Sequence, residues 1–213
     1  MKKRMIIVSI LLVCVIAFAS IGIISSAGNR YNSDSVSETQ RELYHISKND
    51  LKEIDKNWKY DPTIVDRKMI DSQSDEVAKQ TGQDKKTVQK KMIDRSVESR
   101  ALYLAALDAG FSATDSEVKN EIDDLKRVIH EDPEAEKDLK AVIDGYEMSE
   151  DEYWKKVAPQ YKTGIIVNKY LDKEYEKRKS KTKGFIDGEK EQKLETEWRQ
   201  EIVNSAIKKY GRE

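Results

Sequence analysis

The sequence predicts an all-α protein, and three observations lead to that class. Prolines and glycines are few, with three and nine in 213 residues, and charged residues make up 37% of the chain. This composition favours long solvated helices over a turn-rich β fold. From Ile64 onwards, apolar residues also recur at helical spacing between recognisable start and stop signals. The apolar fraction of 38% is enough for one modest helical core.

The first predicted element is a membrane-spanning helix over residues 5–24, a run without a charged residue. As a helix that rises ~1.5 Å per residue, it spans about 30 Å, the thickness of the hydrocarbon core of a bilayer. Lys2, Lys3 and Arg4 precede the run and predict a cytoplasmic N-terminus with the rest of the chain outside the cytoplasm. The alternative is a signal peptide cleaved after Ser-Ser-Ala at 25–27, which would yield a secreted protein.

Residues 29–60 are predicted to be an extracytoplasmic tether or arm. Residues 29–42 are rich in Ser, Asn and Gln, which is typical of a flexible linker. Residues 43–58 carry apolar residues at irregular spacing, so a helical arm lying on the domain and an undocked tether both stay open. The predicted division is therefore 1–28 for the anchor or signal segment, 29–60 for the tether and 61–213 for a helical domain.

The domain is predicted to begin with a weak helix over residues 64–78, which ends at Thr81 and Gly82. Asp84 is the predicted N-cap of the longest helix, and Gly110 is its predicted end. This long helix has two adjoining faces, so we expect it to be packed from two sides. One face consists of Val88, Met92, Ser96, Ser99, Tyr103 and Ala106, and the other of Ile93, Val97, Ala101, Leu104 and Leu107.

A one-sided helix is predicted after Thr114, because Glu117 three residues later completes a capping box. Its charged residues face water, which leaves one apolar side for the core. After an acidic break around Pro133, residues 134–143 predict a short helix that Gly145 ends. The apolar stripe of the first of these helices consists of Val118, Ile122, Leu125 and Val128 or Ile129.

Ser149 and Glu152 form a second capping box ahead of an aromatic-rich segment, in which Pro159 is predicted to bend or restart the chain. Residues 179–189 form a short connector, and the last helix is predicted over residues 190–211. An apolar stripe needs a surface to cover, so we expect the last helix to fold back on the long helix and close the core. This stripe consists of Leu194, Trp198, Ile202, Ala206 and Tyr210.

Two stretches carry a recognisable ordered pattern: LYLAALDAGFSATDSEV at 102–118 and MSEDEYW at 148–154. With the helices around them, they resemble the SurA-type N-terminal chaperone domain of extracytoplasmic foldases. The resemblance covers roughly residues 84–178 and the last helix, and it implies a domain that binds unfolded or secreted polypeptides. Larger relatives insert a parvulin prolyl isomerase between the core and the last helix. Here only the connector stands at that place, so the resemblance implies no catalysis.

The aromatic residues indicate where such a domain binds polypeptide. Two compatible interpretations stay open, because the rings either fill gaps between helices or line an open apolar groove for extended segments. The predicted peptide-binding residues are Tyr103, Tyr153, Trp154, Val157, Tyr161, Ile165, Tyr170 and Trp198.

No catalytic, cofactor or metal site is predicted. His45 and His130 are the two histidines, and neither has a plausible catalytic companion. The acidic residues 123–124 and 150–152 are explained as helix surface and first-turn acids. Cys14 is the single cysteine, which excludes a disulfide within one chain. The slightly acidic balance argues against nucleic-acid binding.

We therefore expect a membrane-anchored, extracytoplasmic, chaperone-like protein that binds non-native or secreted polypeptides through an apolar helical groove and performs no chemistry. The alternative is a structural or assembly protein of the cell envelope that docks one specific folded partner. The sequence leaves open which clients bind, how many copies associate, and whether the groove is open or occupied by the chain's own N-terminal arm.

Overall fold

The computed structural model of the chain describes residues 59–182 and 188–211, and every regular element in these two ranges is an α-helix. The predicted all-α class is confirmed for this part of the chain. The predicted membrane segment over 5–24 and nearly all of the tether lie outside it. Within the described ranges, no helix combines the length and the apolar character needed to cross a bilayer. In chain order the helices are α3 (Arg67–Thr81), α4 (Lys85–Asp108), α5 (Asp115–His130), α6 (Pro133–Tyr146), α7 (Glu150–Lys179) and α8 (Gly188–Tyr210).

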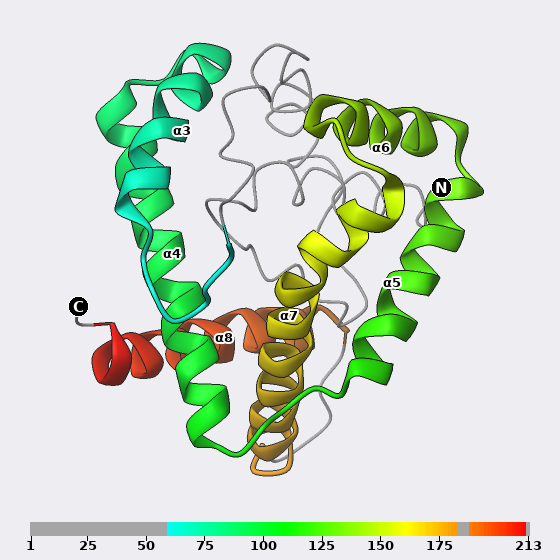
Figure 1. Ribbon diagram of the computed structural model, residues 1–213. Coiled ribbons are helices and arrows are strands. Elements are labelled where there is room, and N and C mark those ends of the chain that lie inside the picture. The colour runs from blue at the N-terminus through cyan, green and yellow to red at the C-terminus, as the bar shows by residue number, and fades with distance from the viewer. Residues whose placement is uncertain (1–58, 183–187, 212–213) are drawn as a thin grey trace.

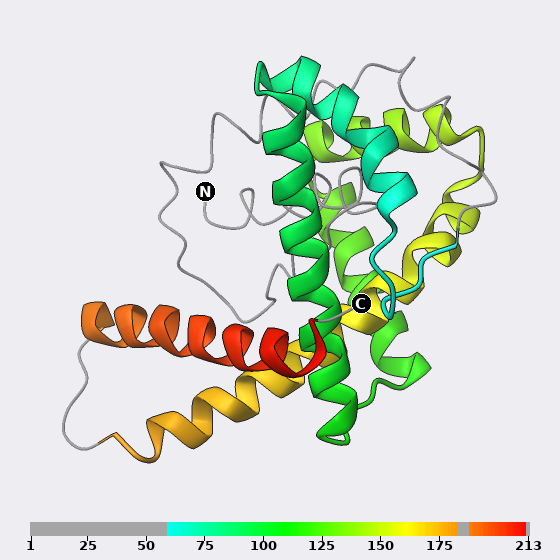
Figure 2. The same cartoon turned by 90° about the vertical axis from the view of Figure 1, so that its left-hand side faces the viewer.

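Helix α4 is the element on which the others are arranged (Figure 1). Helix α3 lies along its first half, α7 crosses its second half, and α8 makes the most extensive helix contact with it. Helices α5 and α6 pack on the other side of α7. The predicted return of the last helix onto the long helix is therefore confirmed. In Figure 2, the C-terminal part of α7 and the start of α8 extend together beyond the other helices.

Most helix ends are where the local sequence predicts them. Gly82 closes α3 in the left-handed conformation, with φ of 64°, and the Asp84 carboxylate then accepts from the backbone N–H groups of Lys86 and Thr87 to begin α4. The capping boxes at Thr114 and Ser149 are both complete, because each N3 glutamate also accepts from the N-cap backbone N–H.

The predicted end of α6 at Gly145 is wrong, because the helix continues through this glycine to Tyr146. The reversal falls on Glu147, which has a φ of 52°. Its N–H donates to the carbonyl of Asp144, and the next N–H donates to the carbonyl of Ile143, as in a Schellman motif. Gly110 makes the same turn after α4, with a φ of 83°. A non-glycine residue can thus take the position that the sequence pattern assigned to glycine.

The predicted restart at Pro159 is also wrong, since α7 runs through this proline without a break. Proline cannot donate to the carbonyl four residues earlier, so one backbone bond of the helix is missing. Figure 1 shows that α7 changes direction along its length, which agrees with the predicted bend. One turn later, the Thr163 hydroxyl donates to the carbonyl of Pro159 at 3.0 Å.

The described core has three groups of buried residues. Two of them meet along α7, and the third holds α3 against α4. The main cluster consists of Ala106, Ala113, Val118, Ile122, Leu125, Ile129, Ala135, Leu139, Ile143, Tyr153, Trp154, Val157 and Ile166. The second cluster consists of Ala101, Leu102, Ala105, Val167, Leu171, Ile202, Val203 and Ala206, and the third of Ile70, Val88 and Met92.

The two predicted faces of α4 are only partly correct. Leu102 and Ala105, which were assigned to neither face, are buried in the second cluster. Leu107 was assigned to an apolar face, yet its side chain is 41% exposed near the end of the helix. The reason is that α8 approaches α4 from a direction that sequence periodicity alone does not specify.

Candidate functional site

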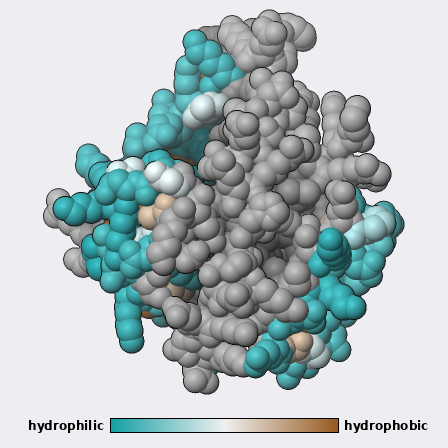
Figure 3. All heavy atoms as spheres, turned by 90° about the horizontal axis from the view of Figure 1, so that it is seen from above, coloured by the Kyte–Doolittle hydropathy of each residue, from teal (hydrophilic) through white to brown (hydrophobic). Residues whose placement is uncertain are grey.

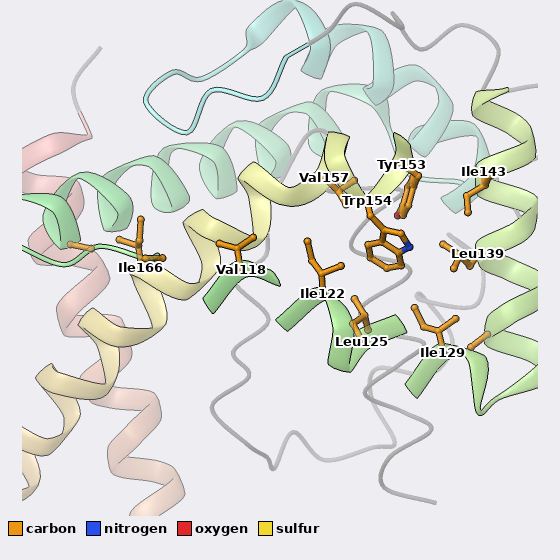
Figure 4. Packing of buried hydrophobic residues seen from close by; sticks show 13 residues of the cluster. Val118, Ile122, Leu125, Ile129, Leu139, Ile143, Tyr153, Trp154, Val157 and Ile166 are labelled. Carbon is orange, nitrogen blue, oxygen red and sulfur yellow. The ribbon is translucent and has the colours of Figure 1, made fainter. Parts of the chain in front are cut away.

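Three of the predicted peptide-binding residues belong to the core. Tyr153, Trp154 and Val157 are 0%, 3% and 0% exposed and form part of the main cluster. In Figure 4, Trp154 points toward side chains from α5 and α6. Its ring meets Tyr153 edge to face at 5.2 Å, and its Nε1 donates to Glu150 Oε1 at 2.9 Å. In this arrangement these residues anchor α7 and do not line an open surface.

The other five predicted residues are partly exposed. Tyr103 from α4 and Tyr170 from α7 pack against both the main and the second cluster, so they mark the junction of the two. Tyr161 and Ile165 lie one turn apart on α7 and pack against the main cluster. Trp198 lies on α8, one turn before the buried Ile202. The structure thus brings Tyr103 and Tyr170 to one junction and places Trp198 on a separate helix.

Phe111 is a further aromatic residue of this region, outside the predicted set. It lies in the turn between α4 and α5, packs against the main cluster and meets Tyr170 edge to face at 5.9 Å. We call Tyr103, Phe111, Tyr161, Ile165 and Tyr170 the aromatic surface. It differs in character from the face in Figure 3, where the described residues are mostly hydrophilic with small apolar spots.

Ion pairs hold α7 to the start of α5 beside the aromatic surface. Lys169 pairs with Glu117 and also donates to the carbonyl of Ser112 at 3.0 Å. Lys162 donates to Asp115 Oδ1 at 3.2 Å. The Lys169 ammonium, together with the Thr114 backbone N–H, lowers the pKa of the Glu117 carboxyl to about 2. The anionic form of Glu117 therefore serves the helix cap and the helix contact together.

The end of the predicted tether lies on the domain. Residues 59–66, which we call the arm, run between α4 and α7 before α3 begins (Figure 1). The Tyr60 phenol is hydrogen-bonded to Thr163 of α7 and lies near Tyr103 of α4. Burial raises the pKa of the Tyr60 phenol. The two alternatives for residues 43–58 fall outside the described ranges, and residues 59 and 60, which follow them, are irregular.

A family model for the SurA-like N-terminal domain matches residues 1–169, well over half of the chain. The chain belongs to this family. The resemblance drawn from the helix pattern is thereby confirmed. Neither the curated proteins nor the solved structures that were compared gave a match.

A SurA-like N-terminal domain indicates a chaperone-like function in general terms, since it is the chaperone part and not the catalytic part of such foldases. The matched residues contain α3 to α6 and α7 as far as Lys169, together with the aromatic surface except for Tyr170. Helix α8 lies after the matched residues, although it completes the second cluster.

One arginine of the SurA-like domain links the arm to the last helix. Arg100 Nε donates to the carbonyl of Thr63 at 2.6 Å, and its Nη1 donates to the carbonyl of Tyr210 at the end of α8. A cation at this position also compensates the negative end of the α8 dipole. Lys209 and Tyr210 add a second link, because both donate to Asp108 Oδ2 at 2.7 Å.

Two polar side chains are buried on α7 between the apolar clusters of the SurA-like domain. Gln160 and Thr163 lie three positions apart, and they are 7% and 4% exposed. The Gln160 Nε2 has no hydrogen-bond partner among the described residues. A buried amide donor without a partner costs about 1–3 kcal/mol, so packing alone does not explain Gln160.

His130 is the last residue of α5, and its neighbours come from two other helices. Its Nδ1 is 3.1 Å from Glu136 Oε1 of α6, and its Nε2 is 3.4 Å from Glu150 Oε1 of α7. These contacts join three helix ends on the surface of the SurA-like domain. Among the described residues, no group of three or more His, Cys, Asp or Glu side chains is placed to hold a metal ion.

Sequence reasoning missed Tyr60, Arg100, Gln160 and Thr163. Asp61 and Pro62 are a turn signal inside the arm, and the Thr63 backbone N–H donates to Asp61 Oδ1 at 2.8 Å. No local signal identifies Arg100 as the residue that binds this turn, because its partners lie 37 and 110 positions away.

Proposed function

We propose that this chain is a membrane-anchored, extracytoplasmic, chaperone-like protein that binds non-native or secreted polypeptides and performs no catalysis on them. The observation that carries the proposal is the family match over residues 1–169. Because that match indicates chaperone-like function only in general terms, the clients, the anchor and the binding surface are the proposed parts.

The aromatic surface supports the choice of unfolded polypeptide as the ligand. Tyr103, Tyr161 and Tyr170 are partly exposed although each packs on the apolar core. Tyrosine rings offer broad apolar contact and a polar edge, so they bind many sequences with little selectivity. The nearby ion pairs of Lys162 and Lys169 give this surface a charged rim, which keeps it soluble when no client is bound.

The charge pattern of the N-terminal sequence supports the location. Residues 5–24 are long and apolar enough to cross a bilayer, and Lys2, Lys3 and Arg4 favour a cytoplasmic N-terminus. Protease added to the outside of intact cells should then remove the helical domain, and carbonate washing should leave the chain in the membrane fraction. Release of a mature chain that begins at Gly28 would support the secreted alternative.

The binding proposal is tested with the full chain in lipid nanodiscs. We expect it to suppress the aggregation of several chemically denatured model proteins at near-stoichiometric ratios, as measured by light scattering. Tyr161→Ala should weaken this suppression, because it removes a partly exposed ring of the aromatic surface. Lys155→Ala is the matched control on the exposed side of the same helix. Absence of suppression across all clients would overturn the proposal.

A pull-down separates client binding from docking to one folded partner. Many substoichiometric unfolded polypeptides support the proposed function. One dominant, stable folded protein, bound equally well by Tyr161→Ala, would instead identify an assembly protein of the cell envelope.

A further inference from the structure

The contact of the arm with α7 has the properties of an occupied binding site. Tyr60 belongs to an irregular segment, yet its side chain is partly buried and its phenol is hydrogen-bonded to Thr163. Thr163 already donates its own proton to the carbonyl of Pro159, so its oxygen is free to accept from the Tyr60 hydroxyl. An aromatic side chain on an extended segment is also what an unfolded polypeptide offers to a chaperone.

The arm does not satisfy this position completely. Gln160 lies one turn before Thr163 on the same side of α7 and is only 7% exposed. Its Nε2 remains without a partner among the described residues while Tyr60 is in place. A segment that brought a backbone carbonyl to Gln160 as well as a tyrosine to Thr163 would gain a hydrogen bond that the arm does not make.

The arm also has an exposed part between Tyr60 and Val65. Between Tyr60 and Asp66, the arm contacts the helices through the bond from Arg100 to the carbonyl of Thr63 and through Val65, which packs against the third cluster. Asp61, Thr63 and Ile64 are exposed, and the Ile64 side chain is 51% exposed. Segments with few buried contacts open at a lower free energy than the core around them. Residues 59–64 can therefore leave their position while Val65 and Asp66 stay with α3.

We propose that Gln160, Thr163 and Tyr103 form a subsite for a tyrosine side chain of an extended polypeptide, and that Tyr60 occupies this subsite until a client displaces it. The inference rests on the proposed function and adds a ligand class and a competitor to it. Because the occupied form does not bind, the apparent affinity for client falls by the fraction of molecules with the arm in place.

The test uses the full chain in nanodiscs and a fluorescein-labelled peptide of Gly and Ser with one central tyrosine. We expect Tyr60→Ala to bind this peptide about fivefold more tightly than the wild type does, by fluorescence anisotropy. In the Tyr60→Ala background, Gln160→Met should reduce binding of this peptide severalfold. A matched peptide with alanine at the centre should bind weakly to every variant.

A measurement on the unmutated chain guards against misfolding of Tyr60→Ala. Saturating tyrosine peptide should accelerate backbone hydrogen exchange in residues 59–64, and the alanine peptide should leave it unchanged. If the wild type suppresses aggregation but exchange in the arm is unchanged, or if Tyr60→Ala binds no better, the subsite proposal is overturned and the proposed function stands. If neither suppression nor peptide binding is found, both proposals fail.

Discussion

The main cluster joins helices that are neighbours in the sequence, whereas the second cluster joins helices that are far apart in the sequence. The main cluster joins α5, α6 and α7, which follow one another, and α5 and α7 begin at capping boxes that the local sequence contains. The second cluster joins α4 and α7 with α8, and its polar links reach from Asp108 to Lys209, 101 positions apart. The comparison teaches that local signals specify one half of the domain, while the other half depends on the return of a distant helix.

The largest expected effect comes from the main cluster. Trp154→Ala should lower the free energy of unfolding by about 3–5 kcal/mol, because it removes a large buried ring among helices α5, α6 and α7. Urea denaturation followed by circular dichroism measures this loss. Trp198→Ala on α8 is the control, and its partly exposed ring should cost clearly less. Equal losses at the two positions would contradict the distinction between the clusters.

Destabilising the second cluster should unfold the domain only locally, at α8. Ile202→Ala removes a side chain that is 2% exposed between α8 and its neighbours, which costs about 2–5 kcal/mol. Since α8 is the last helix, we expect faster hydrogen exchange in α8 with little change in α5. Lys208→Ala, on the exposed side of α8, should leave both unchanged. Equal acceleration in α5 would mean that the two clusters unfold as one unit.

The turn between the clusters gives a third test. Gly110→Ala should destabilise the domain by about 1–2 kcal/mol, because Gly110 has a φ of 83° that an L-residue adopts with strain. Glu147→Gly should act in the opposite direction, since the same turn after α6 now uses a glutamate at φ of 52°. Thermal unfolding of the two variants measures both effects. A loss of stability in Glu147→Gly would show that its side chain contributes more than its backbone costs.

The smallest effect is expected at the cap that follows this turn. Thr114→Ala should cost about 1 kcal/mol, because the Glu117 backbone N–H loses its acceptor. Ser116→Ala, at an exposed position in the same turn of helix, is the matched control.

The cap also has a defined pH dependence. Glu117 has a pKa of about 2 in the folded chain against an ordinary value of 4.5, so its contribution is fully present above pH 4.5. It decreases as the pH falls below 4.5 and is lost below about pH 2. Glu117→Gln should therefore be less stable than the wild type at pH 6, and the difference should shrink as the pH falls through this window. A difference that does not vary with pH would exclude the ion pair with Lys169 as its source.

Local chemistry explains what the sequence predicted correctly. The capping boxes at Thr114 and Ser149, the turn at Gly110 and the apolar stripe of α5 each depend on residues within one or two turns of each other. For this reason residue spacing alone predicted the helix starts and the core face of α5. The prediction that α6 ends at Gly145 was wrong because the residue with left-handed backbone conformation is Glu147, two positions later.

The binding residues were harder to predict, because burial depends on which helix arrives at each face. Tyr153 and Tyr161 belong to the same helix and have the same side chain, yet only Tyr153 is buried. The difference comes from α6, whose Leu139 and Ile143 share the main cluster with Tyr153. The position of Tyr60 depends in turn on Thr163, about a hundred positions further along the chain.

Arg100 connects the two ends of the described chain through hydrogen bonds. Its guanidinium holds the carbonyl of Thr63, close to where the domain begins, and the carbonyl of Tyr210, close to where it ends. A force applied to the segment before the domain would meet the contact of Tyr60 with Thr163 first and the Arg100 contact next, which joins α4 to the end of α8. An anchor that pulls on this domain would load its longest-range contacts first.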